Sequence, residues 1–462
     1  MEGRGLGSRR TQQVGKDGRL GNLSTPKSVR QLQTALHAKA KAEAGYRFYA
    51  LYDKVYREDI LAHAWAQCRS NKGAPGVDGQ DFEAIEAYGV QRWLGELALA
   101  LRQETYRADP IRRVFIPKAN GKLRPLGIST LRDRVSMTAA MLVLEPIFEA
   151  DLPPEQYAYR AGRNASQAVV EVGKLLYHGR ADVVDADLAD YFGSIPHAEL
   201  LKAVARRVVD RRVLHLLKMW LECSVEETDD RGRKTRTTQA KDSGRGIPQG
   251  SPISPLLANL YMRRFVLGWK KLGLEQRLGS RIVTYADDLV ILCKRGRAEE
   301  ALKQMREIMG KLKLTVNEEK TRICKVPQGE FDFLGYTFGR VYSAVTGEAY
   351  ISYRPSKKSI QRVIESIHEL TDQKTTWQDA AQLVGKLNRV LRGWANYFQV
   401  GWNGRAYRAI ETYTAARLRR WLRKKHKVRR HGFLAYPPEY LYETLGLVSL
   451  ADRKRDRSCA KA

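Results

Sequence analysis

The sequence contains few of the residues that cross-linked or zinc-stabilised folds require. Its five cysteines are widely scattered, and no two of them form a CxxC pair. Disulfide frameworks and zinc modules depend on paired cysteines at short, regular spacing. We therefore expect free thiols, mostly buried, and neither kind of framework.

Long apolar runs are lacking as well. No stretch approaches the roughly 20 apolar residues that a membrane span requires, and the opening residues, MEGRGLGSRR, have no apolar run like that of a signal peptide. We expect a cytoplasmic protein without a membrane partner.

Acidic residues are strongly outnumbered by basic ones. The 51 Asp and Glu face 81 Lys and Arg, which leaves a net charge of +30. Such an excess destabilises a compact fold by self-repulsion unless a polyanion offsets it, so nucleic acid is the expected partner. Charge alone also fits a merely soluble basic protein or one that lies on an anionic membrane.

The hydrophobic residues are numerous enough to form packed domain cores. The chain has 462 residues, 43% of them hydrophobic, which allows two or three domains. Helical spacing of apolar residues predicts helices over about 28–67 and 82–103, separated by the breaker NKGAPGVDG. A hairpin is predicted next, with Asn120-Gly121 at its tip.

Further along, the pattern changes twice. From about 130 to 340, helices alternate with short β-branched runs, which is typical of an α+β fold. After Pro355 only helical periods remain. We expect a mobile basic leader, an N-terminal extension that leads into the first hairpin, a central α+β region, a helical region and a short basic tail, over residues 1–25, 26–110, 111–340, 341–430 and 431–462.

Two adjacent acids stand between apolar runs in RIVTYADDLVILC. Asp287 and Asp288 would be costly inside a core if unpaired. A hairpin would place them at its turn, exposed to a cleft where divalent cations can neutralise them. The alternative is a plain solvated Asp-Asp turn.

A second acidic group precedes it in ADVVDADLADYFGSIPH. Here Asp185, Asp187 and Asp190 follow another β-rich run and come just before an aromatic pair. Two Mg²⁺ ions can activate a 3′-hydroxyl and stabilise a leaving pyrophosphate when carboxylates converge from separate strands. Asp187 and Asp287 are suited to bridge both ions.

Together these residues resemble a known family. Tyr285-Ala286-Asp287-Asp288 resembles the catalytic box of reverse transcriptases, and Asp187–Phe192 resembles their first metal-binding strand. The resemblance implies a right-handed fingers–palm–thumb polymerase that uses dNTPs and two Mg²⁺ ions, with Mn²⁺ as a substitute. It implies a metal site made of Asp187, the Leu188 backbone carbonyl, Asp287 and Asp288, and it leaves Asp185 and Asp190 open.

The resemblance extends to the nucleotide. It makes Phe192 the residue beneath the sugar that excludes a ribose 2′-hydroxyl, with ordinary core packing as the alternative. In IPKANGKLRPLGI it implies that Lys118 and Arg124 hold the triphosphate. In GRGIPQGSPISPLLANLYM it places Gln249 against the sugar or base, and in LKLTVNEEKTRI it brings Lys320 towards the phosphates.

Residues 353–400 resemble the maturase segment of group II intron proteins, which serves as thumb and intron-binding surface. Cations share its helices with apolar stripes, an arrangement suited to phosphate contact opposite a packed face. Solvated surface positions are the alternative for about half of them. Trp394 could stack on a base, but its helical spacing favours the core. The expected RNA-binding residues are Lys357, Lys358, Arg362, Lys386, Arg389, Arg392, Arg423, Lys424 and Lys425.

The resemblance therefore implies an RNA-directed DNA polymerase of a mobile retroelement. It would copy group II intron RNA into cDNA during retrohoming and act as a maturase that assists splicing, with template RNA, DNA primer and target DNA as partners. Only His431 and Cys459 could serve an endonuclease after Arg430, so we expect no such domain. The oligomeric state stays open, a homodimer included. Alternatives are a reverse transcriptase used in phage defence or spacer acquisition, and a splicing factor without polymerase activity.

Overall fold

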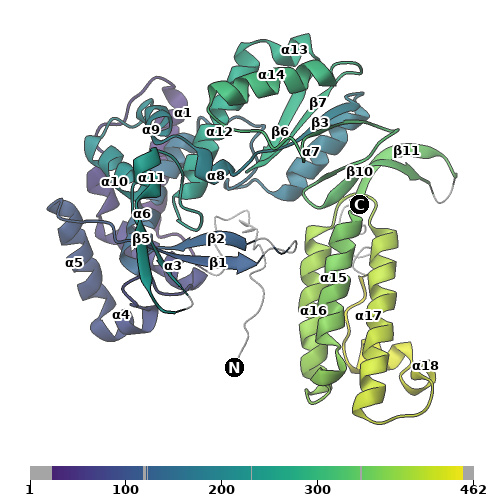
Figure 1. The fold of residues 1–462 in the computed structure, drawn as a ribbon. Coiled ribbons are helices and arrows are strands. Elements are labelled where there is room, and N and C mark those ends of the chain that lie inside the picture. The colour runs from purple at the N-terminus through teal and green to yellow at the C-terminus, as the bar shows by residue number, and fades with distance from the viewer. Residues whose placement is uncertain (1–22, 118–120, 122, 230, 344–345, 451–462) are drawn as a thin grey trace. The chain divides into compact units, whose positions relative to one another are not determined.

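The computed structural model describes residues 23–117, 121, 123–229, 231–343 and 346–450. Within them the chain divides into two compact units. The first comprises residues up to 164, 186–289 and 299–321, and the second comprises 165–185, 290–298 and those from 322 onward. The fold is α+β, as the sequence predicts, with many helices and small sheets (Figure 1).

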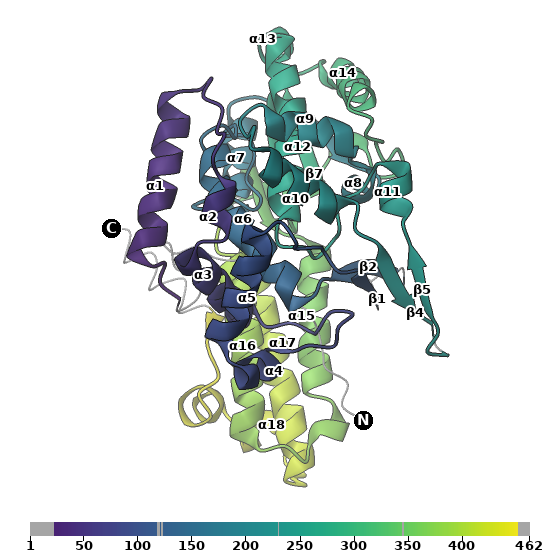
Figure 2. The ribbon, with the colours of Figure 1, turned by 90° about the vertical axis from the view of Figure 1, so that its left-hand side faces the viewer.

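The first unit begins with helices of which α1, α2 and α3 pack on the long helix α6, while α5 packs on α3. Gln33 of α1 donates to the Leu142 carbonyl of α6 at 3.1 Å, and Figure 2 shows α1 as a long purple helix. These helices are α1 (Lys27–Ala42), α2 (Tyr52–Val55), α3 (Glu58–Asn71), α4 (Phe82–Tyr88), α5 (Val90–Arg102) and α6 (Leu131–Glu149).

One expectation about this region is wrong. The single helix expected over about 82–103 is two helices, α4 and α5, which meet at Gly89. The φ of Gly89 is 104°, a conformation that glycine adopts without steric cost. Its N–H donates to the Ile85 carbonyl and its own carbonyl accepts from Trp93, so one glycine ends α4 and begins α5.

The predicted hairpin after α5 is confirmed. Strands β1 (Ile111–Pro117) and β2 (Leu123–Ile128) pair antiparallel, with Arg112 opposite Ile128. Lys118, Asn120 and Lys122 lie outside the described residues. The full sheet has the order β2-β1-β4-β5, in which β4 (Val225–Thr228) pairs parallel to β1 and antiparallel to β5 (Lys234–Thr237).

A second four-stranded sheet carries both acidic segments. Its order is β6-β7-β3-β8, formed by β3 (Asp182–Asp187), β6 (Arg281–Tyr285), β7 (Asp288–Cys293) and β8 (Arg322–Lys325). The residues that flank the acids along the strands are buried, including Val184, Ile282, Val283 and Leu289. The β-rich runs of the sequence are therefore core strands that end at acids, as predicted.

Eight further helices belong to the central region within the described residues. They are α7 (Ala165–Tyr177), α8 (Tyr191–Ser194), α9 (His197–Ala205), α10 (Arg211–Leu221), α11 (Gln239–Ser243), α12 (Ser254–Lys271), α13 (Leu274–Arg277) and α14 (Ala298–Lys311). Two tyrosines of this region bridge elements: the Tyr191 hydroxyl donates to the Ala258 carbonyl at 2.6 Å, and the Tyr261 hydroxyl donates to the Leu312 carbonyl at 2.6 Å.

In the second unit a small antiparallel sheet precedes a helical bundle. Strands β9 (Phe331–Phe333), β10 (Tyr336–Tyr342) and β11 (Ala349–Pro355) pair in the order β11-β10-β9. No strand follows Pro355 among the described residues, as predicted. The next elements are α15 (Lys357–Leu370), η1 (Gln373–Thr375), α16 (Ala380–Tyr397), α17 (Gly404–Lys425), α18 (Gly432–Ala435) and η2 (Tyr440–Thr444).

Helices α15, α16 and α17 lie side by side in both views (Figures 1 and 2). Their apolar stripes form one core that includes Val363, Ile367, Leu383, Leu387 and Leu391, all predicted from spacing. Trp394 packs against this core and donates its indole N–H to the Ser359 carbonyl, so its helical spacing reports packing. No helix among the described residues is both long and apolar enough to span a bilayer.

Candidate active site

One of the predicted acids, Asp187, is bonded to a lysine. Asp187 is the last residue of β3, and its Oδ2 accepts from the Lys320 ammonium at 2.8 Å and from the Asn317 amide at 3.1 Å. The pKa of Lys320 lies above its ordinary value, first because of the hydrogen bond to Asp187 and then because Asp187, Asp287 and Asp288 all act on it electrostatically. The Lys320 ammonium therefore lies within the field of three carboxylates.

Asp287 and Asp288 occupy the position expected of them, at the turn between β6 and β7. Ala286 takes a positive φ of 57°, which makes the reversal tight, and Asp288 is the first residue of β7. Asp287 is exposed and Asp288 is half-buried. Burial raises the pKa of Tyr191, the first residue of α8, and the charges of Tyr261 and Asp287 add to this effect.

The backbone carbonyl of Leu188, the residue after Asp187, points away from the segment that faces it. Leu188 forms an isolated antiparallel bridge with Val316. The flanking hydrogen bonds run from Asn317 N–H to the Asp187 carbonyl and from Ala189 N–H to the Thr315 carbonyl, each at 2.9 Å. In such a pair the N–H and C=O of the middle residue point away from the facing strand. The Leu188 carbonyl is thus directed away from residues 315–317.

The other two acids have different partners. Asp185 accepts from the Arg322 guanidinium at 3.2 Å. The Asp190 carboxylate covers Gly193, where an added Cβ would lie only 2.0 Å from its Oδ2. A side chain at 193 would therefore displace Asp190.

These oxygens suit a hard cation. Three carboxylates and a backbone carbonyl are the ligands that Mg²⁺ prefers, and the Lys320 ammonium is already bonded to one of the carboxylates. Among the described residues, no three His, Cys, Asp or Glu side chains are gathered as a metal-binding group. The donor types fit the metal, whereas Asp187 is bonded to Lys320.

The nucleotide-binding candidates of the fingers and of the PQG loop come together. The Arg124 guanidinium of β2 donates to the Gln249 side-chain oxygen at 3.0 Å. The Gln249 carbonyl accepts from Gly127 N–H at 2.7 Å. Gly250 fits this close approach because a Cβ there would lie 2.4 Å from the Gly127 carbonyl oxygen. Lys118 lies outside the described residues.

Phe192 links that loop to the acids. It belongs to α8, is half-buried, and lies with its ring centroid 5.7 Å from that of Tyr191. Its carbonyl accepts from Ile247 N–H at 2.7 Å, and the Ile195 carbonyl accepts from Gly246 N–H at 2.9 Å. The segment after β3 is thus hydrogen-bonded to the GRGIPQG loop, which lies more than 50 residues further along the chain.

The predicted RNA-binding cations fall into two groups. Lys357, Lys358, Arg362, Arg389, Arg392 and Lys424 are exposed. Lys386, Arg423 and Lys425 are half-buried and bond within their own unit, to the Gln378 side chain, the Arg429 carbonyl, and the Thr376 and Gln378 carbonyls, respectively. The second group helps to fix the bundle.

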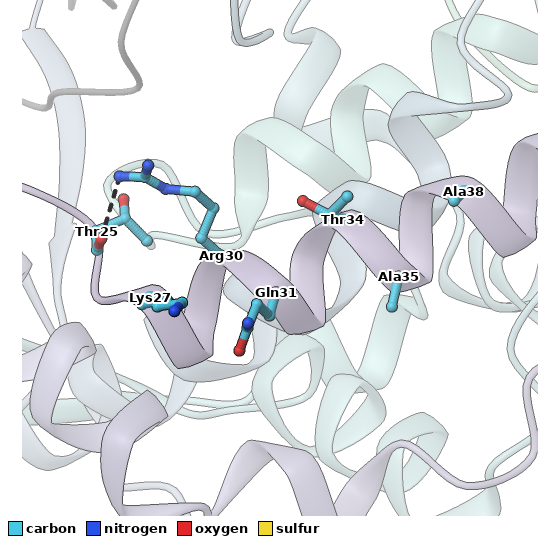
Figure 3. Close-up of a pocket in the computed structure, with 7 residues that line it drawn as sticks. All are labelled: Thr25, Lys27, Arg30, Gln31, Thr34, Ala35 and Ala38. Carbon is cyan, nitrogen blue, oxygen red and sulfur yellow. Dashed lines mark hydrogen bonds between the residues drawn. The ribbon is translucent and has the colours of Figure 1, made fainter.

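One hollow of the first unit lies away from these residues. It runs along α1 and is lined by Thr25, Lys27, Arg30, Gln31, Thr34, Ala35 and Ala38 (Figure 3). Arg30 turns back and donates to the Thr25 carbonyl at 3.3 Å. No predicted site residue lines it.

Comparison with known proteins gives two family matches. Residues 116–338 match the reverse transcriptase (RNA-dependent DNA polymerase) family, and residues 360–436 match the group II intron, maturase-specific domain. The first match contains every acid of the site, and the second covers most of α15 and all of α16 to α18.

Individual relatives agree with these matches. Protein YkfC of Escherichia coli is 33% identical over 72% of this chain and 93% of its own length. Group II intron-encoded protein LtrA of Lactococcus lactis is 28% identical over 61% of this chain. The putative COX1/OXI3 intron 1 protein of Saccharomyces cerevisiae is 24% identical over 60% of it. The matches cover 45% and 38% of those two relatives, so this chain spans less than half of each.

Proposed function

We infer the function from a membership that the matches establish: the chain belongs to the reverse transcriptases that carry a group II intron maturase-specific domain. It is an RNA-directed DNA polymerase. We propose that it is encoded by a group II intron, copies that intron's RNA into cDNA, and binds the same RNA to assist splicing. The names of the intron-encoded relatives support the substrate.

The observation that carries the catalytic proposal is the Lys320 ammonium beside Asp187 and within the field of Asp287 and Asp288. It supports a metal site at these carboxylates, because all three already act electrostatically on one positive charge. Asp187, Asp287, Asp288 and the Leu188 carbonyl would hold Mg²⁺, or Mn²⁺ in its place. When bound, the metal would lower the pKa of the primer 3′-hydroxyl and neutralise the leaving pyrophosphate.

The chain's own residues supply the remaining contacts. A dNTP brings about four negative charges, which charge-assisted hydrogen bonds from fixed cations stabilise. Arg124 and Lys320 are positioned for that task, each now bonded to a residue of the site, Gln249 and Asp187. We propose that Lys118 joins them. Phe192, held by its bond to the GRGIPQG loop, would lie beneath the sugar and exclude a 2′-hydroxyl.

The RNA-binding proposal rests on the helical bundle. Residues 357–430 contain eighteen Lys and Arg against five Asp and Glu. An exposed cationic surface of this kind binds phosphates and releases counterions. Intron RNA, template RNA with a DNA primer, and target DNA are the proposed partners.

The polymerase function is tested by extension of oligo(dT) on poly(rA) with dTTP and Mg²⁺. We expect DNA synthesis that stops when EDTA is added. Absence of product from folded protein would refute the proposal. For the maturase function, RNA transcribed from the DNA flanking the gene should bind more tightly than an unrelated transcript of equal length, and equal affinities would refute intron specificity.

A further inference from the structure

A tryptophan at one end of the helical bundle is displayed to solvent. Trp377 lies in the turn of residues 371–379 between α15 and α16, and 79% of its surface is exposed. Trp421, by contrast, is 2% exposed in the core of the same bundle. Tryptophan is buried on average, so a nearly fully exposed indole indicates a binding surface more often than a packing position.

The turn that carries Trp377 is held by hydrogen bonds from helix α17. The Lys425 ammonium of α17 donates to the Thr376 carbonyl at 3.1 Å and to the Gln378 carbonyl at 2.8 Å, which are the carbonyls on either side of Trp377. The Trp421 indole N–H donates to the Thr375 hydroxyl at 3.0 Å. Because the backbone is already held, a ligand on the indole would lose little affinity to ordering of the turn.

Cations surround the same turn. Lys424 donates to the Gln373 side chain, Lys386 donates to the Gln378 side chain, and Lys374 is exposed within the turn. Its two acids are engaged as helix caps: Asp372 accepts from Lys374 N–H at 2.9 Å, and Asp379 accepts from Ala381 N–H at 2.9 Å. The surface around the indole is therefore suited to a polyanion.

We propose that Trp377 is a stacking platform for one unpaired nucleobase of RNA, with Lys374 and Lys424 beside the adjoining phosphates. The occupant follows from the proposed function of the bundle, and the site itself follows from the exposed ring, the fixed turn and the cations. A base inside an A-form helix has both faces covered by its neighbours, whereas a bulged base can be splayed out onto an aromatic ring. The platform thus selects RNA with an unpaired nucleotide.

The test compares two RNA probes and two proteins. The probes are duplexes of about twenty base pairs that differ only by one bulged adenosine at the centre. We expect the full chain to bind the bulged duplex more tightly, and Trp377→Ala to remove roughly five- to hundredfold of that preference, the range of one stacked base. Affinity for the fully paired duplex should stay within twofold.

Two further variants separate stacking from charge. Trp377→Phe should keep most of the preference, because it keeps an aromatic face. Lys374→Ala should lower the slope of log affinity against log salt for both probes, whereas Trp377→Ala should leave that slope unchanged. Tyr49→Ala is the matched control, since Tyr49 is 70% exposed on the other unit and should not affect the preference.

Several results would overturn the platform. One is a parental protein with no preference for the bulge, and another is a Trp377→Ala protein that keeps it. A third is loss of self-association in Trp377→Ala with the preference intact, which would assign the ring to a second copy of the chain. Extension of oligo(dT) on poly(rA) is measured in parallel, so that failure of the polymerase function is seen separately. Equal melting temperatures of the two proteins would exclude misfolding of the turn.

Discussion

The carboxylate site and the helical bundle handle their positive charges in different ways. In the site, Lys320 is paired with Asp187, and beside it Arg322 is paired with Asp185. In the bundle, five of the nine predicted RNA-binding cations make no side-chain hydrogen bond or ion pair within the described residues: Lys357, Lys358, Arg362, Arg389 and Arg392. A paired cation must exchange its partner before it contacts a phosphate, whereas an unpaired one exchanges only water. The site is therefore arranged to change state when substrate arrives, and the bundle is ready to bind.

The largest effect should come from a carboxylate of the site. Asp287→Asn should lower primer extension by roughly 10²–10³-fold or more, because it removes a charge that stabilises the transition state. Affinity for intron RNA, which uses the bundle, should stay nearly unchanged. Extension of oligo(dT) on poly(rA) and filter binding measure the two properties. Asp53→Asn, at an exposed aspartate of α2, is the control, and extension by Asp287→Asn within tenfold of the parent would refute the metal assignment.

The converse change is charge reversal in the bundle. Glutamate at Lys357, Lys358 and Arg362 should weaken intron RNA binding by roughly 10–10²-fold if each exposed contact is worth about 0.5–1 kcal/mol. The slope of log affinity against log salt should fall by about 2, the share of three phosphates on a single strand. Filter binding across a salt series measures both.

Short-primer extension by the same triple variant should be impaired less than intron binding. Some loss is expected, because a thumb also holds template and primer. Parental affinity together with a parental salt slope would show that these three cations are ordinary solvated surface.

The sequence predicted the acids better than their surroundings. Asp187, Asp287 and Asp288 stand out because charged residues directly after apolar strand runs are costly unless something neutralises them. Part of the neutralising charge comes from Lys320, which lies 133 residues from Asp187 in the sequence. No local pattern reports such a pairing. The bond between Arg124 and Gln249, 125 residues apart, is equally invisible to periodicity, because it depends on how β2 meets the PQG loop.

Local backbone conformations were the other weak point. The helix expected over 82–103 obeys one apolar spacing throughout, yet it breaks at Gly89 because glycine offers a positive φ at little steric cost. The apolar spacing of the sequence does not single out Trp377, since this residue follows no helical stripe. Its isolation among polar residues in TDQKTTWQDA was the available signal. The domain limits near 340 and 430 stay predictions.

Phe192 offers a smaller effect that is confined to the site. Phe192→Ala should lower discrimination against ribonucleotides by about tenfold, the order expected when a pocket loses one steric contact. Incorporation of dTTP and UTP on poly(rA) gives the ratio. Phe192→Tyr keeps the ring and should keep the discrimination. An active Phe192→Ala enzyme with the parental ratio would mean that the ring serves only to pack α8.

The smallest effect is expected from the ion pair between Lys320 and Asp187. If the Lys320 ammonium competes with a metal ion for Asp187, Lys320→Ala should strengthen Mn²⁺ binding to the nucleotide-free protein. An ion pair with a lysine that is 65% exposed is worth about 0.2–1 kcal/mol, so the gain should not exceed about fivefold. Electron paramagnetic resonance of free Mn²⁺ measures it without any turnover. Lys320→Arg retains the charge and should bind Mn²⁺ as the parent does, and Lys311→Ala, an exposed lysine of α14, controls for net charge.

The same Lys320→Ala protein should need more dNTP for half-maximal synthesis, because its phosphate contact is gone. Unchanged Mn²⁺ affinity with a raised dNTP requirement would leave Lys320 a phosphate ligand only. Unchanged values of both would show that the pairing with Asp187 has no part in catalysis, and the contrast between paired and unpaired cations would then carry no functional meaning.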